Sequence, residues 1–143
     1  MADDTATIAV RQFQAMGEGK LPGLLGLELV SAAPDRFECR FDVTERHLAP
    51  NGYLHAASVI ALADTLCGYA AGVSLPKGAV GFTTAELKSN FLATARSGGV
   101  RAFAEPMHRG RTTQVWDARV LREDDTAVIA LFRCTQLILW PKS

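Results

Sequence analysis

Residues 54–73, LHAASVIALADTLCGYAAGV, decide the fold that we expect for this chain. Apolar side chains lie on almost every side of a helix drawn through this stretch, which is the one long helical candidate in the sequence. A helix that is apolar all round is buried on most sides, whereas a surface helix keeps one polar face. The longest apolar run, residues 59–73, contains Asp64 and several small residues, so it is too short and too interrupted to cross a bilayer. We therefore expect a core helix that the rest of the chain covers.

Segments with strand character lie on both sides of this helix. Residues 37–43 alternate apolar and polar side chains, which is the period of a half-buried antiparallel strand. Similar composition or alternation occurs in residues 24–30, 83–92, 100–107, 112–121 and 126–140. This order predicts an α+β fold, in which one curved antiparallel sheet wraps around one long central helix. The sheet has edges that need covering, and pairing with a second subunit would cover them.

The 143 residues correspond to a single domain. Ile8, Phe13 and Met16 form a rough helical stripe near the N-terminus, and the glycines that follow end it. We expect residues 1–20 to form an N-terminal helical segment and residues 21–143 to form the core.

Charge and cysteine content limit the partners and the compartment. Fifteen basic residues balance fifteen acidic ones, so no overall positive field attracts nucleic acid or an anionic membrane, and we expect neither as a partner. Cys39, Cys67 and Cys134 are odd in number and lack zinc-ligand spacing, which predicts buried thiols, no disulfide framework and no metal site. Asp3 and Asp4 stand where a signal peptide carries basic residues, so we expect a cytoplasmic protein.

The residue that points most strongly to function is Asp64, in the middle of the central helix. Removing an ionised carboxylate from water costs several kcal/mol, so packing does not explain an acid at this position. One alternative is a structural carboxylate that pairs with a buried base or with backbone amides, or that lies at a dimer interface. The other alternative is a catalytic acid, and the position alone leaves both open.

His55 stands at the start of the same helix. The unpaired N–H groups there, of Ala56 and Ala57, can stabilise a carbonyl oxygen as it becomes an oxyanion. A histidine at this position is, by itself, more often a helix-start residue than a catalytic one. His55 and Asp64 are nine residues apart, about 13–14 Å along the helix and on opposite sides of it. If both act on one substrate, the helix start of one subunit must meet Asp64 of another. A twofold dimer with antiparallel central helices would form two such sites.

Three segments of the sequence resemble the hotdog-fold acyl-CoA thioesterases, in the branch of the phenylacetate-degradation and 4-hydroxybenzoyl-CoA thioesterases. They are LAPNGYLHAA at 48–57, ADT at 63–65 and NFLATA at 90–95. The family pattern is a polar residue, Pro, any residue, Gly, any two residues and His-Gly-Gly, with an acid nine residues after the His. The resemblance covers roughly residues 24–139.

The resemblance implies a hotdog homodimer, formed through helix and sheet, that pairs further into a homotetramer. It implies hydrolysis of an aryl- or medium-chain acyl-CoA thioester to the free acid and coenzyme A, which is part of the substrate, with no separate cofactor. Asp64 would be the nucleophile or the general base. The Ala56 amide of the partner subunit would form the oxyanion hole beside His55, and Thr84 would help to place the carboxylate or the water. Substrate contacts are implied for Asn51, Gly52 and Ala57.

The same resemblance implies that the coenzyme A nucleotide binds near the loop of Arg109, Gly110, Arg111 and Thr112. Two guanidinium groups around a glycine, with hydroxyl groups adjacent, form a plausible phosphate-binding loop. A solvated hairpin turn explains the same residues equally well.

The sequence departs from the family pattern at several positions. Ala56 and Ala57 replace the two glycines, Ala49 replaces the polar residue, and Gly68 lacks a hydroxyl that some relatives carry. These changes allow a weaker enzyme, a shifted acyl specificity, or a noncatalytic acyl-CoA-binding or regulatory hotdog protein. Hydratase or dehydratase chemistry is disfavoured, because it uses a different His and acid motif and the sequence places no second histidine near the helix.

Overall fold

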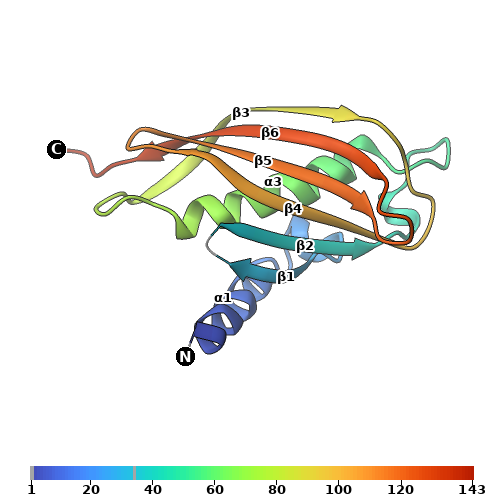
Figure 1. Cartoon of the computed structure of the whole chain (residues 1–143), viewed down its shortest axis with the longest axis horizontal. Coiled ribbons are helices and arrows are strands. Elements are labelled where there is room, and N and C mark those ends of the chain that lie inside the picture. Colours follow the sequence, from blue (N-terminus) through green and yellow to red (C-terminus); the bar gives the residue numbers. More distant parts are fainter. Residues whose placement is uncertain (1, 34) are drawn as a thin grey trace.

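The computed structural model describes residues 2–33 and 35–143 and contains a six-stranded antiparallel sheet wrapped around one long helix (Figure 1). This arrangement confirms the predicted α+β hotdog fold. The elements in chain order are α1 (Ala2–Met16), α2 (Leu21–Leu24), β1 (Glu28–Ala33), β2 (Arg36–Asp42), a 3-10 turn (Glu45–His47), α3 (Ala56–Val73), β3 (Gly81–Phe91), β4 (Gly99–Arg109), β5 (Thr113–Arg122) and β6 (Val128–Leu139).

Two predicted boundaries differ from the structure. The strand expected over residues 24–30 begins only at Glu28, because Leu21–Leu24 forms a short helical turn with Pro22 near its start, where the fixed φ of proline suits a helix. The same strand also runs further than expected, to Ala33, and Pro34 beyond it lies outside the described residues.

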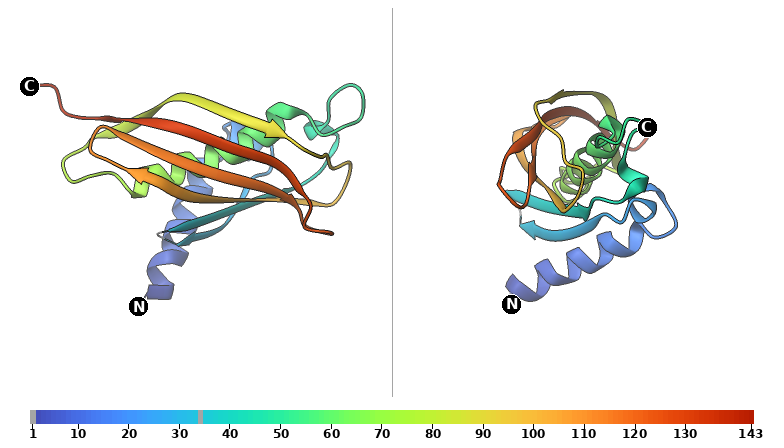
Figure 2. Two further views of the ribbon diagram at one scale, coloured as in Figure 1. Left: turned by 45° about the horizontal axis from the view of Figure 1, so that its top comes forward. Right: turned by 90° about the vertical axis from the view of Figure 1, so that its right-hand side faces the viewer.

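The strand order β1-β2-β4-β5-β6-β3 leaves β1 and β3 at the edges of the sheet. The sheet curls around α3, as the end-on view in Figure 2 shows. By length and composition alone α3 could span a membrane, but its place inside the curl makes it the core helix. The core combines inward strand side chains with one face of α3 and includes Phe37, Phe41, Leu62, Leu66, Val100, Trp116, Val120 and Ile129.

The N-terminal helix α1 lies against the β1 edge (Figure 2). Gln14 donates to the Leu27 carbonyl at 2.9 Å and accepts from the Leu29 amide at 2.9 Å. In the predicted stripe, Phe13 stacks on Tyr69 at 4.7 Å, whereas Ile8 and Met16 are 47% and 58% exposed. The predicted N-terminal helix is present as α1, and of the three stripe residues only Phe13 packs against the core.

The opposite edge, β3, has no such cover within the described residues. Leu87 and Phe91 lie opposite Cys134 and Ala130 of β6, whose side chains face the core, so they share that inner face. They are nevertheless 37% and 46% exposed. An eleven-residue edge strand with exposed apolar side chains is a pairing surface.

Candidate active site

The start of α3 is capped by His55. Its Nδ1 accepts the N–H of Ala57 at 2.9 Å, so a neutral ring carries its proton on Nε2. The Ala57 amide is therefore committed to the cap. The N–H of Ala56 meets no acceptor in the described part of the chain, and residues 55–57 are exposed. One outward-pointing amide and one imidazole N–H remain at this helix start to meet a ligand oxygen.

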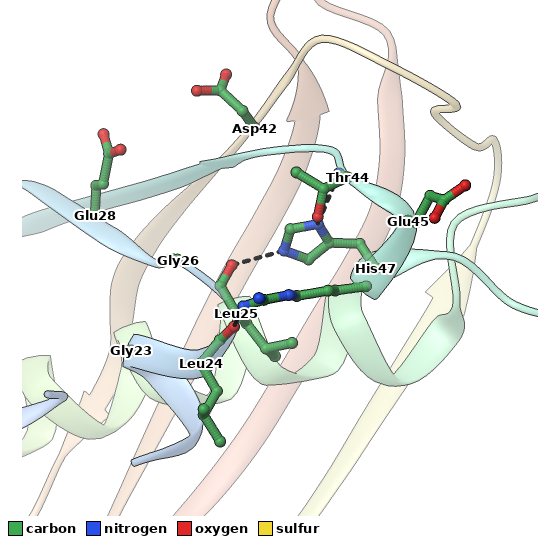
Figure 3. Close-up of a pocket in the computed structure, with 10 residues that line it drawn as sticks. Gly23, Leu24, Leu25, Gly26, Glu28, Asp42, Thr44, Glu45 and His47 are labelled. Carbon is green, nitrogen blue, oxygen red and sulfur yellow. Dashed lines mark hydrogen bonds between the residues drawn. The ribbon is translucent and has the colours of Figure 1, made fainter. Parts of the chain in front are cut away.

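His47 fixes the position of this helix start. Its carbonyl accepts the His55 amide at 2.8 Å and the Ser58 hydroxyl at 2.9 Å. Its ring is buried, with Nδ1 accepting the Thr44 amide at 2.9 Å and Nε2 lying 2.6 Å from the Leu25 carbonyl (Figure 3). These contacts tie the segment around α2 to the loop that carries His55. The sequence interpretation gave His47 no role, because its partners lie on separate segments.

A cavity of about 630 Å³ adjoins His47 on the side of α2 (Figure 3). Glu28, Asp42 and Glu45 contribute acidic groups to its lining. The lining also includes Arg46, and Arg40 pairs with two of these acids, Glu28 and Asp42. Asp64 and His55 do not line this cavity, so we do not assign it to the candidate active site.

The turn before the helix is held by its own side chains. Asn51 accepts the Tyr53 amide at 3.1 Å, and Gly52 has a φ of 84°, which favours glycine. The Leu54 amide donates to the Thr94 hydroxyl at 3.2 Å. Asn51 and Gly52 are exposed beside the start of α3, so a ligand reaching Ala56 would pass them.

Asp64 lies in the middle of α3 and is half-buried. Its Oδ1 is buried and has no hydrogen-bond partner in residues 2–33 and 35–143. Burial raises the pKa of this carboxyl above its ordinary value of 3.8. Of the structural alternatives, pairing with a base or with backbone amides does not apply to Oδ1 within the described residues, whereas a structural carboxylate at a dimer interface stays open. His55 caps one end of the helix and Asp64 lies nine residues further, about 13 Å along the axis, so one chain does not bring them together.

Thr84 lies on β3 opposite Gln136 of β6. Its hydroxyl donates to Gln136 Oε1 at 2.9 Å, and Gln136 Nε2 lies 3.4 Å from Cys134 Sγ. A hydrogen bond with Cys134, together with burial, raises the pKa of the Cys67 thiol. The Thr84 proton is thus directed to Gln136, which leaves the oxygen lone pairs to accept. Sequence reasoning missed Gln136, although a glutamine at an inward position of an alternating strand was a signal.

The loop of Arg109 to Thr112 is the β4–β5 hairpin tip, near the C-terminal end of α3. Gln114 Nε2 donates to the Ser74 carbonyl at 2.8 Å, which joins the hairpin to that end. Arg109 forms an ion pair with Asp35 at 2.8 Å. A β-carbon at Gly110 would lie 2.5 Å from Nε2 of the exposed His108, so a larger residue there would have to displace that side chain.

One protomer thus holds three separate parts of the predicted site. The helix start carries His55, Ala56, Ala57 and the turn of residues 51–52, Asp64 is at mid-helix, and the arginine loop lies beyond the other end. In the described ranges, 2–33 and 35–143, no group of three His, Cys, Asp or Glu side chains is placed to hold a metal ion.

Comparison with known proteins gives consistent matches. The family model of the thioesterase superfamily matches residues 51–129. A 1,4-dihydroxy-2-naphthoyl-CoA hydrolase of Listeria monocytogenes is 32% identical over 111 residues, covering 78% of this chain and 89% of that protein. A protein of the same name from Escherichia coli is 31% identical over 116 residues, covering 81% and 85%. The structure of a mutant thioesterase PA1618 from Pseudomonas aeruginosa matches with a TM-score of 0.86 and 28% identity, covering 91% and 93%.

Proposed function

Because the chain belongs to the thioesterase superfamily and is a thioester hydrolase, we propose that it hydrolyses an aryl- or medium-chain acyl-CoA to the free acid and coenzyme A. The relatives from Listeria monocytogenes and Escherichia coli are named hydrolases of an aryl-CoA thioester, which supports this substrate class.

The observation that carries the proposal is the carboxylate oxygen of Asp64, which is buried without a hydrogen-bond partner in the described residues. An unsatisfied buried polar atom costs about 1–3 kcal/mol, more when charged, and a catalytic role is one of the explanations for such an atom in a native structure. Asp64 is the acid nine residues after His55, where the thioesterase pattern places its catalytic carboxylate.

The groups that complete the site around Asp64 come from a second subunit. The uncovered β3 edge is where two protomers would pair their sheets, and this pairing would bring the two α3 helices together antiparallel. Ala61 lies on the same face of α3 as Asp64, and its small side chain allows the partner to approach closely there, whereas Gly68 on that face is covered by Phe82 of β3. Each dimer then contains two sites, each formed by His55 and Ala56 of one protomer and Asp64 of the other.

In such a site the Ala56 N–H and the His55 Nε2–H donate to the thioester oxygen as it gains negative charge. Asp64 either removes a proton from a water that attacks the carbonyl carbon, or attacks that carbon itself. In the first route the C–S bond breaks, the thiolate takes a proton, and coenzyme A and the acid leave. In the second route coenzyme A leaves an aspartyl anhydride, which water then hydrolyses. Rapid quenching and intact-mass measurement distinguish the routes, because only the second acylates the protein.

The rest of the proposal follows from the same site. Thr84 accepts a hydrogen bond from the attacking water, Asn51, Gly52 and Ala57 line the approach to Ala56, and the loop of residues 109–112 binds the nucleotide. Coenzyme A enters as part of the substrate, and no separate cofactor, nucleic acid or membrane takes part. Dimers pair further into a tetramer, and the enzyme acts in the cytoplasm, where its three buried cysteines stay reduced.

The test is release of free thiol from a panel of aryl- and alkyl-CoA thioesters by wild type, Asp64→Ala and Asp64→Asn. Hydrolysis by wild type with a loss of about 100-fold or more in both variants supports the proposal. Asp124→Asn is the matched control, because Asp124 is 78% exposed at a hairpin tip. Tight binding of the esters without thiol release would instead support a noncatalytic acyl-CoA-binding protein, which the extra methyl group at Ala56 favours. Full activity in the Asp64 variants would contradict the assignment.

A further inference from the structure

The arginine loop contacts Trp140, a residue just beyond β6 that is distant in sequence. The Arg111 guanidinium carbon lies 5.0 Å from the centre of the indole ring, within cation–π range. The indole N–H donates to the Arg111 carbonyl at 3.1 Å. Trp140 therefore holds both the side chain and the backbone of Arg111.

Trp140 also lies beside the loop between α3 and β3. Gly78, in the loop between α3 and β3, has a φ of 90°, and a β-carbon there would lie 3.4 Å from Trp140 Cζ3. The Ile138 amide also donates to the Thr112 carbonyl at 2.9 Å, which joins the hairpin tip to the strand that leads to Trp140. A guanidinium stacked on a fixed ring loses less side-chain entropy when it binds an anion.

The two arginines of the loop differ in charge balance. Arg109 pairs with Asp35, so an acid offsets its charge. Arg111 forms no ion pair with an acid in the described ranges of the chain, 2–33 and 35–143. The positive charge that the hairpin tip offers to a ligand is therefore mainly that of Arg111.

The loop also lies at a suitable distance from the reacting carboxylate. Gln114 joins the hairpin to Ser74, which is ten residues beyond Asp64, about 15 Å along the helix axis. A pantetheine arm, with two amide groups and short alkyl links, has about the reach of five extended residues, roughly 16 Å. A thioester at Asp64 thus allows the phosphates at the other end of the arm to reach Arg111.

We infer that Trp140 is a positioning residue, which fixes Arg111 as the principal phosphate-binding cation for the nucleotide end of a coenzyme A thioester. This inference rests on the proposed function, in which the loop of residues 109–112 binds the nucleotide, and it adds Trp140, which lies outside that loop, as the residue that positions Arg111. Arg109 contributes less to phosphate binding, because its ion pair with Asp35 offsets its charge.

The test compares one acyl group carried on coenzyme A and on N-acetylcysteamine, which lacks the nucleotide and its phosphates. Losing a charge-assisted phosphate contact of about 1.5–3 kcal/mol raises KM about tenfold or more. We expect Arg111→Ala to raise KM for the coenzyme A ester by that factor, with kcat nearly unchanged and no change for the N-acetylcysteamine ester. Trp140→Leu shifts KM in the same direction by a smaller factor, and Trp140→Phe retains most of the wild-type value because a ring remains.

Arg36→Ala is the matched control, because Arg36 also stacks on an aromatic ring, that of Phe103 at 4.3 Å, but on another part of the sheet. Arg109→Ala is expected to raise KM less than Arg111→Ala. If Arg111→Ala raises KM equally for both esters, or leaves KM for the coenzyme A ester unchanged, the inference is overturned. The proposal that the protein hydrolyses thioesters is not affected by either result. If wild type hydrolyses neither ester, calorimetric titration with adenosine 3′,5′-bisphosphate still tests the inference about Arg111 and Trp140. Weaker binding to Arg111→Ala and Trp140→Leu supports the inference, and equal binding refutes it.

Discussion

Replacing Asp64 by Asn removes the charge and keeps the shape of a side chain whose Oδ1 is buried without a partner in the described residues. Burial raises the pKa of the carboxyl, so its ionised form is less stable in the folded protein than in the unfolded chain. This penalty is complete above the raised pKa and disappears as the pH falls toward the ordinary value of 3.8. Because the side chain is only half-buried, we expect Asp64→Asn to raise the free energy of unfolding by about 1 kcal/mol at pH 7. This corresponds to a rise of roughly 3–5 °C in Tm.

The same variant is expected to lose about 100-fold or more in kcat/KM, because Asn neither accepts the proton of water nor attacks the thioester. Urea unfolding at a fixed protein concentration, at pH 7 and at pH 4, measures the first effect, and thiol release measures the second. Asp124→Asn serves as the control in both assays. A variant that is less stable than wild type at pH 7, or that keeps more than about a tenth of the activity, would refute the reasoning. In wild type, kcat/KM is expected to fall with decreasing pH as Asp64 is protonated through its raised pKa. The absence of an acidic limb above about pH 5 would count against a raised pKa for Asp64.

Three further changes test separate parts of the structure. Leu87→Asp places a charge on the exposed inner face of β3, so it is expected to yield monomers by sedimentation, with activity lost in parallel; active monomers would contradict the dimeric site. His47→Ala removes a buried ring and two hydrogen bonds, and it is expected to destabilise the fold by roughly 3 kcal/mol in urea unfolding, whereas a change below 1 kcal/mol would show that the ring is not needed. Glu123 binds Arg40 at 2.7 Å, which lowers the pKa of its carboxyl below the ordinary 4.5, so Glu123→Gln is expected to cost about 1 kcal/mol at pH 7. That cost should vanish in acid as the pH falls through the lowered pKa, and a constant difference would exclude the ion pair as its source.

The central helix and its sheet were predictable because their signals are local. Residues 54–73 are apolar on almost every side, and the structure places α3 there, with one face buried under the sheet, the other half-buried and His55 as its cap. The error at residues 24–30 has a local cause as well, since Pro22 starts a helical turn within an apolar run that composition alone assigns to a strand.

The parts of the site that the sequence left open depend on distant partners. Arg109 and Arg111 look equivalent in the sequence, and only the fold brings Asp35 to one and Trp140 to the other. Gln136 likewise becomes a partner of Thr84 only when β6 pairs with β3. The strand alternation marks Gln136 as an inward residue, but no sequence period or short motif identifies its partner or that of either arginine.

Complementation between two inactive variants tests the shared site most directly. Asp64→Asn keeps an intact helix start, and His55→Ala keeps an intact carboxylate, so a mixed dimer contains one complete site and one that lacks both groups. When the two proteins are unfolded, mixed in equal amounts and refolded, half of the dimers are mixed, and thiol release is predicted to recover to about a quarter of the wild-type rate. A rate that stays at the average of the two parent variants would show that His55 and Asp64 do not meet across a dimer.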